Sequence, residues 1–480
     1  MYLNWIEFFI YFLIIFIIII HIFLERRSVS NILMWIFFIY IFPIVGVIIY
    51  SFFNEFYFFK NKNIKVKRKK FLVRFYSKKL NKFIYNHQTN NSVFNFLFNL
   101  CKKEQGTLGI KGNKITLLSN YKTSLSNIIR DIDAASHSIE MVFYIWHVGG
   151  LVNKVSEALI NASIRGVRCK VLIDSFGSWM FFYTSLFKKM RKSGITIIKC
   201  LKINFFYFLF HRIDFRQHKK MIIIDHNISY VGSMNMVDPY FFKKKKNIGP
   251  WIDILIRIQG PFSSVLSVMY AFDWEMETGE KLYTSLLNKK YFFKKKNTNN
   301  MIQLVTSGPG YSKKLIQQVL VTAIFSAKRK LILTTPYFVP TNYLVYALCA
   351  AAMRGVEVLI ILPKKTNSFL VNWASRSFYT ELLEAGVKIY QFKNGMLHTK
   401  SILVDNQLSL VGSFNLDIRS FWLNFEITVI IEDEIFGKHL NIVQYDYLSN
   451  STPILKNQWK KRPAWNYILE QICYFFSPFL

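Results

Sequence analysis

Two long apolar runs, separated by a short charged turn, occupy the first 58 residues. Residues 8–24 and 28–54 contain no Asp, Glu, Lys or Arg. Each run can supply roughly the 20 residues that a helix needs to cross a bilayer. Glu25, Arg26 and Arg27 between the runs are too polar to lie in hydrocarbon. The pattern therefore predicts a two-helix transmembrane hairpin over residues 1–58.

Two alternatives to the hairpin fit this segment less well. A cleaved signal peptide would need a basic stretch before Phe8 and a small-residue cleavage site after the first run, and the sequence has neither. Two short buried helices would be expected to carry charges on their outer faces, and these charges are missing. The hairpin is therefore the interpretation that the sequence favours.

The segment that follows the second run, residues 59–113, is strongly basic. Its first part contains Lys60, Lys62, Lys65, Lys67, Arg68, Lys69, Lys70 and Arg74, whereas the turn between the runs contains only two arginines. Basic residues that flank membrane helices gather on the cytoplasmic side. We therefore expect residues 59–113 to be a juxtamembrane segment, with everything after it in the cytoplasm.

From about Lys114 the pattern changes to an alternation of helices and buried strands, and this alternation occurs twice. The first series predicts a helix over 125–135, a strand over 138–145, a helix over 155–165 that ends at Gly166, and a strand over 167–174. The second predicts a helix over 315–327, a strand over 331–335, a helix that ends at Gly355, and a strand over 356–362. This is an α/β chain with two homologous halves, 114–287 and 301–450, a linker over 288–300 and a carboxy-terminal segment over 451–480.

Each half ends in the same polar motif. The first copy is His218-x-Lys220-x4-Asp225, followed after six residues by Gly-Ser233-x-Asn235. The second copy is His398-x-Lys400-x4-Asp405, followed at the same spacing by Gly-Ser413-x-Asn415. In a strand the histidine and the lysine of each copy share one face, because side chains alternate with a period of two. Two copies at corresponding places of a duplicated chain are hard to explain by chance.

The residue types of this motif suit phosphodiester exchange. That chemistry needs a nucleophile, an acid for the leaving alcohol and cations around the phosphoryl oxygens. The paired histidines and lysines can supply all three, and the Ser and Asn side chains can add hydrogen bonds to substrate. The sequence contains no carboxylate cluster or His/Cys set that indicates a metal, so we expect no metal and no other cofactor. For Asp225 and Asp405 a structural role at the strand end and a direct catalytic role both stay open.

Composition and charge narrow the class of partner only slightly. The formal net charge is +34, which favours an anionic partner, either a phospholipid surface or a nucleic acid. Compositional drift is the alternative explanation for runs such as 243–246 and 294–296. Five scattered cysteines without a close pair argue against a disulfide framework and a zinc cluster; they are Cys101, Cys169, Cys200, Cys349 and Cys473.

The paired motifs resemble those of the phospholipase D superfamily, and the whole chain resembles bacterial cardiolipin synthases within it. Supporting segments lie around both motifs: Arg216-Gln217-His218, Trp251-Ile252-Asp253, Thr335-Pro336-Tyr337-Phe338, and Gly412 to Asp417 continuing to Arg419-Ser420. The resemblance implies duplicated phospholipase D-like α/β/α domains with pseudo-twofold symmetry and one active site between them. It also implies a multi-pass protein of the bacterial inner membrane, with phosphatidylglycerol and anionic membrane lipids as partners and no nucleic acid.

The same resemblance implies a reaction and roles for individual residues. Two phosphatidylglycerol molecules would give cardiolipin and glycerol through a phosphohistidine intermediate, with His218 as nucleophile and His398 as acid and base. Asp253 and Glu426 would orient the histidines through their second nitrogen; the alternative for both is an exposed surface carboxylate.

Three rival functions remain at this stage. A hydrolytic phospholipase D would use water in the second step, and a membrane-tethered nucleic-acid phosphodiesterase would suit the basic charge. A non-catalytic membrane scaffold is the third, and the retention of all six motif residues argues against it. The sequence leaves open the acyl-chain preference, the oligomeric state and the use of phosphatidylethanolamine or other alcohols as co-substrate.

Overall fold

The computed structural model describes residues 2–24, 29–53, 62–85, 94–202, 214–242, 248–287, 293, 300–312 and 314–476. The chain forms two compact units, one of residues 1–60 and 202–215 and the other of residues 61–201 and 216–480. Of the predicted linker over 288–300, only Phe293 and Asn300 lie within the described residues.

The amino-terminal unit contains three apolar helices, α1 (Tyr2–Leu24), α2 (Val29–Ile41) and α3 (Pro43–Phe53). Ile22, Trp35 and Tyr50 pack together in its small core. The prediction of one continuous helix over 28–54 is wrong, because the helix is interrupted at Phe42. Pro43 follows directly, and a proline has no N–H for the helical hydrogen bond. Within the described ranges no helix combines the length and apolar character of a membrane span, so the predicted hairpin of two spanning helices is not confirmed.

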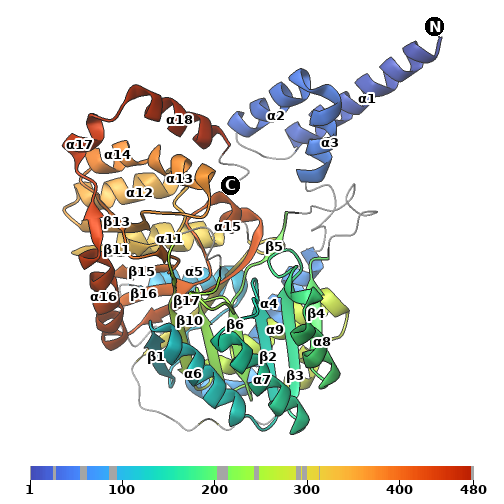
Figure 1. Cartoon of the computed structure of the whole chain (residues 1–480), viewed down its shortest axis with the longest axis vertical. Helices are drawn as coiled ribbons and strands as arrows, with labels where there is room; N and C mark the ends of the chain where they lie inside the picture. Colours follow the sequence, from blue (N-terminus) through green and yellow to red (C-terminus); the bar gives the residue numbers. More distant parts are fainter. Residues whose placement is uncertain are drawn as a thin grey trace. The chain divides into compact units, whose positions relative to one another are not determined.

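The larger unit contains both halves of the duplicated region (Figure 1). It begins with α4 (Lys62–Lys79), η1 (Asn81–Phe83) and α5 (Asn95–Gln105). The first half then consists of β1 (Lys114–Leu118), α6 (Tyr121–Asp133), β2 (Ser138–Phe143), α7 (Leu151–Ile164), β3 (Arg168–Asp174), η2 (Phe181–Tyr183), α8 (Ser185–Lys192), β4 (Thr196–Cys200), β5 (Arg216–Gln217), β6 (Met221–Ile224), β7 (Ile228–Gly232), β8 (Trp251–Ile252), β9 (Leu255–Gln259), α9 (Phe262–Thr278) and α10 (Tyr283–Leu286).

The second half repeats this order of elements. It consists of β10 (Met301–Ser307), α11 (Leu315–Ser326), β11 (Lys330–Thr334), α12 (Asn342–Met353), β12 (Glu357–Pro363), α13 (Phe369–Arg376), α14 (Tyr379–Glu384), β13 (Lys388–Phe392), β14 (Met396–Leu397), β15 (Ser401–Val404), β16 (Leu408–Gly412), α15 (Ile418–Trp422), β17 (Asn424–Glu432) and α16 (Glu434–Ser449). The chain continues with β18 (Ser451–Pro453), α17 (Lys456–Lys460) and α18 (Ala464–Phe475).

The strand orders of the two sheets confirm the predicted duplication. Among the described residues the first sheet runs β1-β9-β7-β6-β2-β3-β4. The second runs β10-β17-β16-β15-β11-β12-β13, with β18 added at its edge. In each sheet the strand that follows the motif histidine, β6 or β15, lies antiparallel between the hairpin partner and a strand of the parallel part. The α/β assignment and the predicted strands and helices are thus confirmed.

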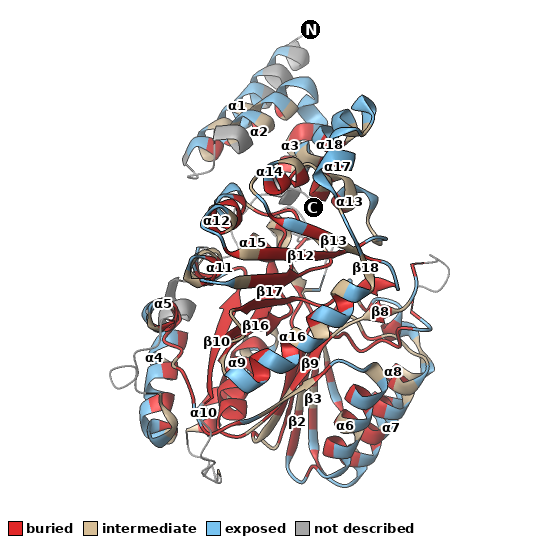
Figure 2. Cartoon of the chain, turned by 90° about the vertical axis from the view of Figure 1, so that its left-hand side faces the viewer, coloured by how far each residue is buried: buried red, intermediate tan, exposed pale blue. Residues whose placement is uncertain are grey.

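Each sheet is covered by helices on both faces. In the first half, α6 and α7 bury apolar residues such as Ile128 and Leu159 against β2 and β3, while α9 packs against β2, β6, β7 and β9. In the second half, α11 and α12 cover one face, and α16 contacts β13, β15 and β16 from the other. Figure 2 shows the buried strands between partly exposed helices. Each half therefore has an α/β/α arrangement.

Glycines end the matching helices α7 and α12 for a conformational reason. Gly166 and Gly355 both have a φ of 89°, in the left-handed region that other residues rarely adopt. In neither case would an added Cβ meet an atom within 4 Å, so the backbone angle alone favours glycine. The helix ends that the sequence predicts therefore have the same cause in both halves.

Two very short strands cross from one half to the other. β5, directly before His218, pairs in parallel with the start of β17 in the second half. β14, directly before His398, pairs in parallel with β8 in the first half. These reciprocal pairings join the two sheets at the two motif histidines.

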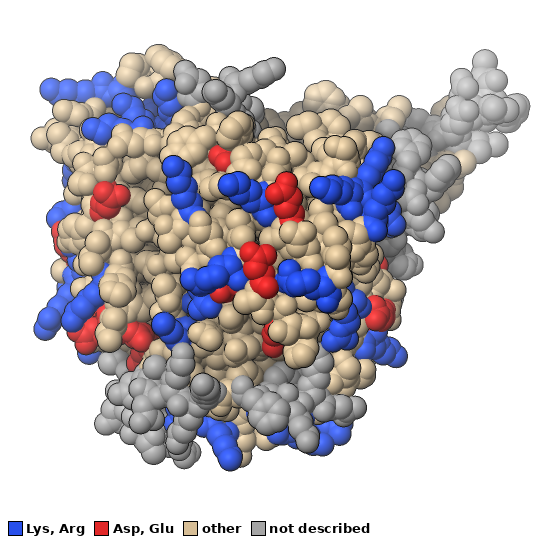
Figure 3. Space-filling model, turned by 60° about the horizontal axis from the view of Figure 1, so that its bottom comes forward, with Lys and Arg blue, Asp and Glu red and all other residues tan. Residues whose placement is uncertain are grey.

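Positive charge is not collected into one stripe on the face shown in Figure 3. Lys and Arg side chains lie there beside Asp and Glu side chains, over a surface that is otherwise uncharged. Among the described residues on this face, basic and acidic side chains are therefore interspersed and form no continuous basic groove.

Candidate active site

Each motif histidine is fixed by backbone hydrogen bonds to the opposite half. The N–H of His218 donates to the carbonyl of Phe425 at 3.0 Å, and the N–H of His398 donates to the carbonyl of Ile252 at 2.8 Å. In the strand pairs β5–β17 and β14–β8, the next residues in register are the histidine and a carboxylate of the other half. Those carboxylates are Glu426 and Asp253.

The carboxylates bind the Nδ1 atoms of the histidines. His218 Nδ1 lies 2.8 Å from Glu426 Oε1, and His398 Nδ1 lies 2.7 Å from Asp253 Oδ1. The side chains of Glu426 and Asp253 are only 0% and 7% exposed, which is incompatible with the alternative of exposed surface carboxylates. A carboxylate accepts, so Nδ1 of each ring donates, and we assign the free lone pair to Nε2. This tautomer is the one that a nucleophile or a base requires.

Aromatic rings hold the two imidazoles from the side. The ring of Tyr144, at the end of β2, meets His218 edge-on with 4.9 Å between centroids. The ring of Trp251, in β8, lies 4.5 Å from His398. Such contacts leave each imidazole few alternative rotamers, because a ring of this size fills the space into which it would turn.

Each motif lysine contacts the histidine of its own half. Lys220 Nζ donates to the carbonyl of His218 at 2.5 Å, and Lys400 Nζ donates to the carbonyl of His398 at 2.6 Å. Burial lowers the pKa of Lys400 to about 8, against the opposing effect of Asp253 and Glu426. Burial and the Lys400 charge also hold the pKa of Lys220 well below its usual value, although Glu426 opposes them. Cations that repel one another in a buried site bind an anion readily.

The histidines are neutral in the free enzyme. Burial lowers the pKa of His398 to about 3, and Lys400 and Lys220 lower it further against the effect of Asp253. Burial, with Lys220, Lys400 and Arg419, holds the pKa of His218 well below its usual value. Each histidine thus senses the lysine of the other half, which means that the two motifs form one electrostatic site.

The serines of the Gly-Ser-x-Asn segments lie beside the two carboxylates. Gly232 and Gly412 leave no room for a Cβ, which would lie 2.3 Å and 2.2 Å from the carbonyl oxygens of Ile254 and Ile427. This close approach brings Ser233 to Asp253 and Ser413 to Glu426, and each serine hydroxyl forms a hydrogen bond to its carboxylate. The predicted substrate contacts of the two serines stay predictions.

The two asparagines differ in their surroundings. Asn235 Oδ1 accepts a hydrogen bond from the N–H of Ile145 at 3.2 Å. Asn415 Oδ1 is buried and has no hydrogen-bond partner among the described residues. A buried polar atom without a partner costs free energy, so the two asparagines are not equivalent. The predicted substrate contacts of both asparagines stay predictions.

Asp225 and Asp405 lie away from the histidines, at the far ends of β6 and β15. Asp225 accepts the backbone N–H groups of Ser136, His137 and Ser138 at 2.8–2.9 Å. Asp405 accepts those of residues 328, 329 and 330 at 2.7–2.9 Å. The geometry favours the structural alternative for both, since each carboxylate fixes the turn that leads into β2 or β11.

Sequence reasoning missed several residues around Glu426. Ser420 Oγ donates to Glu426 at 3.0 Å, and Asn424 Nδ2 lies 3.3 Å from the same oxygen. Arg419 and Tyr144 act on the site through charge and ring contact. Position could have indicated Arg419 and Ser420, because they follow the second Gly-Ser-x-Asn segment closely.

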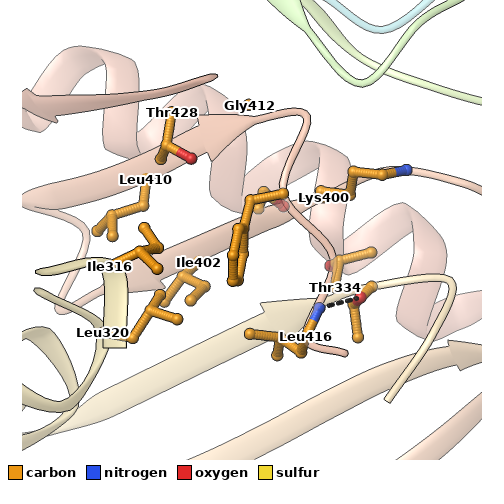
Figure 4. A pocket seen from close by; sticks show the side chains of 12 residues that line it. Ile316, Leu320, Thr334, Lys400, Ile402, Leu410, Gly412, Leu416 and Thr428 are labelled. Atoms are coloured by element: carbon orange, nitrogen blue, oxygen red, sulfur yellow. Dashed lines mark hydrogen bonds between the residues drawn. The ribbon is translucent and has the colours of Figure 1, made fainter. Parts of the chain in front are cut away.

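A small cavity of about 20 Å³ lies beneath Lys400 in the second half (Figure 4). Its lining is mostly apolar and comes from α11, β15 and β16 and the segment after β16, including Ile316, Leu320, Ile402, Leu410 and Leu416. This volume suffices for about one water molecule. It is too small for a phospholipid head group.

Within the described part of the chain, no three His, Cys, Asp or Glu side chains are grouped so that they could hold a metal ion. The expectation of a metal-free reaction stays a prediction. Two oriented imidazoles beside two buried ammonium groups can attack a phosphodiester, protonate its leaving alcohol and neutralise its oxygens.

Comparisons with known proteins agree with this chemistry. The family model described as "Cardiolipin synthase, PLD-like domain", where PLD means phospholipase D, matches residues 128–250 and 320–444. The chain is 49% identical over 479 residues to cardiolipin synthase A of Proteus mirabilis strain HI4320, covering 100% of this chain and 99% of the relative. Cardiolipin synthase A of Buchnera aphidicola subsp. Schizaphis graminum is also 49% identical, with the same coverage.

A solved structure supports the fold. Phosphatidylserine synthase from Haemophilus influenzae Rd KW20 superposes with a TM-score of 0.58 at 14% sequence identity. The match covers 81% of this chain and 98% of that one. At this identity the likeness concerns the fold alone.

Proposed function

Because the chain belongs to the cardiolipin synthase family of the phospholipase D superfamily, we propose that its active site joins two phosphatidylglycerol molecules into cardiolipin and releases glycerol. The chain is a phosphatidyltransferase. The observation that carries the proposal is the reciprocal pairing of β5 with β17 and of β14 with β8. Through it, one site obtains two histidines, each with a carboxylate from the opposite half.

In the first step, Nε2 of His218 attacks the phosphorus of one phosphatidylglycerol. A P–N bond forms, the P–O bond to the head-group glycerol breaks, and Nε2 of His398 gives its proton to the departing oxygen. The anionic phosphodiester raises the pKa of His398 from its low value in the free enzyme, so that the ring holds a proton in the complex. Lys220 and Lys400 stabilise the charge on the non-bridging oxygens.

The second step reverses the first with a new alcohol. A hydroxyl of the second phosphatidylglycerol gives its proton to His398 and attacks the phosphorus. The P–N bond breaks, His218 is free again, and the product is cardiolipin. A water molecule in place of this hydroxyl would give phosphatidic acid, so the outcome depends on which nucleophile reaches the intermediate.

The surroundings of the two carboxylates support these roles for the histidines. Against the effect of burial, His398 and Lys400 lower the pKa of Asp253, so this carboxylate is fully charged at neutral pH. Burial raises the pKa of Glu426 to about 7, against Lys220 and the hydroxyls of Ser413 and Ser420. A fully charged Asp253 stabilises an imidazolium on His398 better than Glu426 does on His218. This difference suits His398 as proton carrier and His218 as nucleophile.

Product analysis tests the proposal. The purified full chain, in detergent with excess chelator, is given phosphatidylglycerol labelled differently in the head-group glycerol and in the acyl chains. We expect one labelled glycerol per cardiolipin formed. Phosphatidic acid as the main product would assign the chain to hydrolysis. Activity restored only by a divalent ion would contradict the metal-free route, and cleavage of nucleic acid alone would place the chain in another substrate class.

We also propose that the chain is attached to the bacterial cell membrane, with the catalytic region on the cytoplasmic side. Large apolar side chains on α1–α3 are exposed, among them Phe9, Phe37 and Tyr40, and such a surface favours contact with lipid. The basic flank after residue 59 supports the cytoplasmic side. A reporter fused near Lys82 should behave as cytoplasmic, and its export would contradict the orientation.

A further inference from the structure

Helix α18 presents an apolar surface to the outside. Glu470 and Cys473 are buried against the domain, at 0% and 1% exposure. The opposite side carries Trp465, Tyr467, Ile468 and Ile472, which are 51–59% exposed. A surface helix of a globular protein ordinarily has the reverse arrangement, with its apolar stripe inward. The exposed side of α18 can be followed in Figure 2.

Two arginines fix α18 in this orientation. The carboxylate of Glu470 accepts from Arg376 Nε at 3.1 Å and from Arg462 Nη2 at 3.1 Å. Both arginine side chains are largely buried, at 21% and 15% exposure. Turning the helix to bury its apolar side would break both ion pairs and move a charged group. The outward position of the apolar side is therefore built into the packing.

The apolar side of α18 continues onto α13. The rings of Trp465 and Trp373 lie 5.8 Å apart, and α13 begins with the exposed residues Phe369 and Leu370. Asn367, just before α13, accepts a hydrogen bond from the Tyr337 hydroxyl. Six residues form the carboxy-terminal apolar face: Phe369, Leu370, Trp465, Tyr467, Ile468 and Ile472.

This face ends beside the active site. Tyr337 follows β11 as Tyr144 follows β2, and the two tyrosines are close enough to interact electrostatically. Tyr144 in turn packs against His218. A lipid held at the carboxy-terminal apolar face would thus lie next to Tyr337 and Tyr144 beside His218, which together are called the active-site rim.

Basic residues border the carboxy-terminal apolar face. Lys364 and Lys365 precede α13, and Lys456, Lys460 and Lys461 lie in or next to α17; all five are exposed. Over residues 364–376 and 451–476 the sequence has one acidic residue, the buried Glu470. Apolar and aromatic side chains bordered by cations are the combination that binds an anionic bilayer surface.

We propose that the carboxy-terminal apolar face lies in the interface of an anionic lipid bilayer and forms a membrane contact separate from the amino-terminal helices. The inference rests on the proposed function, because it supposes that the substrate is a membrane lipid. In this position the face holds the active-site rim at the depth of the lipid head groups. Phosphatidylglycerol then reaches the histidines without leaving the membrane.

A fluorescent label tests this contact in the full-length protein. All five native cysteines are buried, so Ile468→Cys can be labelled selectively with an environment-sensitive dye. Lys438→Cys is the matched control, because Lys438 is 62% exposed on α16, which covers the other face of the second sheet. In vesicles of phosphatidylglycerol and phosphatidylcholine, a brominated lipid should quench the label at 468 and leave the label at 438 unchanged.

The outcomes of the labelling experiment separate the possible occupants. If aqueous iodide quenches both positions equally in the presence of vesicles, the face is free in solution and the proposal is wrong. If position 468 is shielded from both iodide and brominated lipid, protein covers the face, either this chain's own helices or a second copy, and the proposal is again wrong. The readout needs no turnover, so it does not depend on which product the enzyme makes.

A kinetic comparison gives a second test. The double variant Ile468→Asn/Ile472→Asn should raise KM for phosphatidylglycerol in vesicles by roughly tenfold, from lost apolar contact with the bilayer. On short-chain phosphatidylglycerol below its micelle concentration, kcat and KM should stay unchanged. Equal losses on both substrates would contradict a role in membrane contact. Phosphatidic acid from the wild-type chain would instead count against the proposed function and leave the labelling result intact.

Discussion

At the scale of single residues, chemistry depends on which nitrogen of each histidine is free. His218 and His398 each bind a carboxylate through Nδ1, so Nε2 is the atom left to react in the proposed mechanism. The two carboxylates differ in strength, since the pKa of Asp253 is lowered while burial raises that of Glu426 to about 7. Nearly identical motifs can therefore serve different steps.

A better leaving group should restore part of the activity that is lost when the proton carrier, His398, is replaced. Glycerol leaves poorly without a proton, and general acid catalysis typically contributes about 10²–10⁴-fold. We expect His398→Ala to recover much of its first-step rate on a nitrophenyl phosphodiester, whose leaving group needs no proton. His218→Ala should show no such recovery, because it lacks the nucleophile. Burst kinetics of nitrophenol release measure the first-step rate of both variants. An equal recovery of this rate in His398→Ala and His218→Ala would contradict the different roles assigned to the two histidines.

The low pKa of Lys400 predicts an alkaline limit to activity. Lys400 is charged below about pH 8 and loses its proton above it, and only the charged form stabilises the phosphoryl oxygens. Values of kcat/KM, which report on the free enzyme, should therefore fall as the pH rises through about 8. The fall in kcat should come at higher pH, because bound phosphodiester favours the ammonium form.

Lys400→Arg is the matched variant for this pH dependence. A guanidinium stays charged throughout the accessible range, so the part of the alkaline fall that belongs to Lys400 should disappear and the apparent pKa should shift. An alkaline limb identical to that of the wild type would assign the fall to another group.

The residues that sequence reasoning could identify were those with a repeated pattern. The histidines and lysines were visible because each motif occurs twice at fixed spacing. Asp253 and Glu426 were foreseen only through resemblance, since each acts on the other half of the chain. The contacts of Ser420 and Asn424 with Glu426 were not predicted, although Ser420 lies in a segment that carries the resemblance, because spacing alone does not show which side chains reach the carboxylate.

At the scale of elements, the strands were predictable where long apolar runs form them. Hydrophobic runs form β2, β3, β11 and β12, and a glycine precedes β3 and β12; the structure confirms all four strands. β5 and β14 are two residues long and lack a periodic pattern, and each pairs with a strand of the other half. Nothing local in the sequence predicts a pairing of this kind, although it is the pairing that builds the site.

The carboxylates at the strand ends should matter for stability more than for chemistry. Asp225 has a φ of 52°, which Asn also tolerates, so Asp225→Asn keeps the backbone. It replaces one of the two acceptor oxygens with an NH2 group, so the side chain can no longer accept from all three N–H groups of Ser136, His137 and Ser138. We expect the free energy of unfolding to fall by roughly 1–3 kcal/mol. The kcat of the folded protein should stay within about twofold, since each hydrogen-bonded group lies away from the reacting atoms.

Urea unfolding of the variant and an assay of its folded fraction check this expectation. Asp405→Asn is the natural comparison, because Asp405 binds three backbone N–H groups in the same way. Unchanged stability together with a hundredfold loss of kcat would mean that the aspartates act directly in catalysis.

At the scale of the whole molecule, duplication explains most of the architecture but not all of its detail. Lys219, beside the first histidine, forms a buried ion pair with Asp273 of α9 at 2.6 Å. The equivalent Thr399 instead bonds the hydroxyl of Tyr447 at 3.1 Å. The two halves have thus diverged behind the site while keeping its six motif residues. The sequence could predict the repeat, but not these buried partners, which lie far away along the chain.

The amino-terminal segment shows a different limit of sequence reasoning. Its apolar character was plain, yet the second run forms two helices on either side of Phe42 rather than one. Pro43 and Gly46 lie inside this run, but membrane helices tolerate both residue types, so their presence did not predict the interruption.

In the proposed mechanism, one site made by both halves transfers a phosphatidyl group through His218. Rapid quenching of His398→Ala during reaction with phosphatidylglycerol labelled at phosphorus, followed by peptide mapping, measures this directly. We expect labelled phosphorus on the peptide that contains His218 in His398→Ala, and no labelled peptide in His218→Ala. Label on His398 in the His218→Ala variant would reverse the assigned roles, and full activity of either variant without any labelled histidine would contradict the mechanism itself.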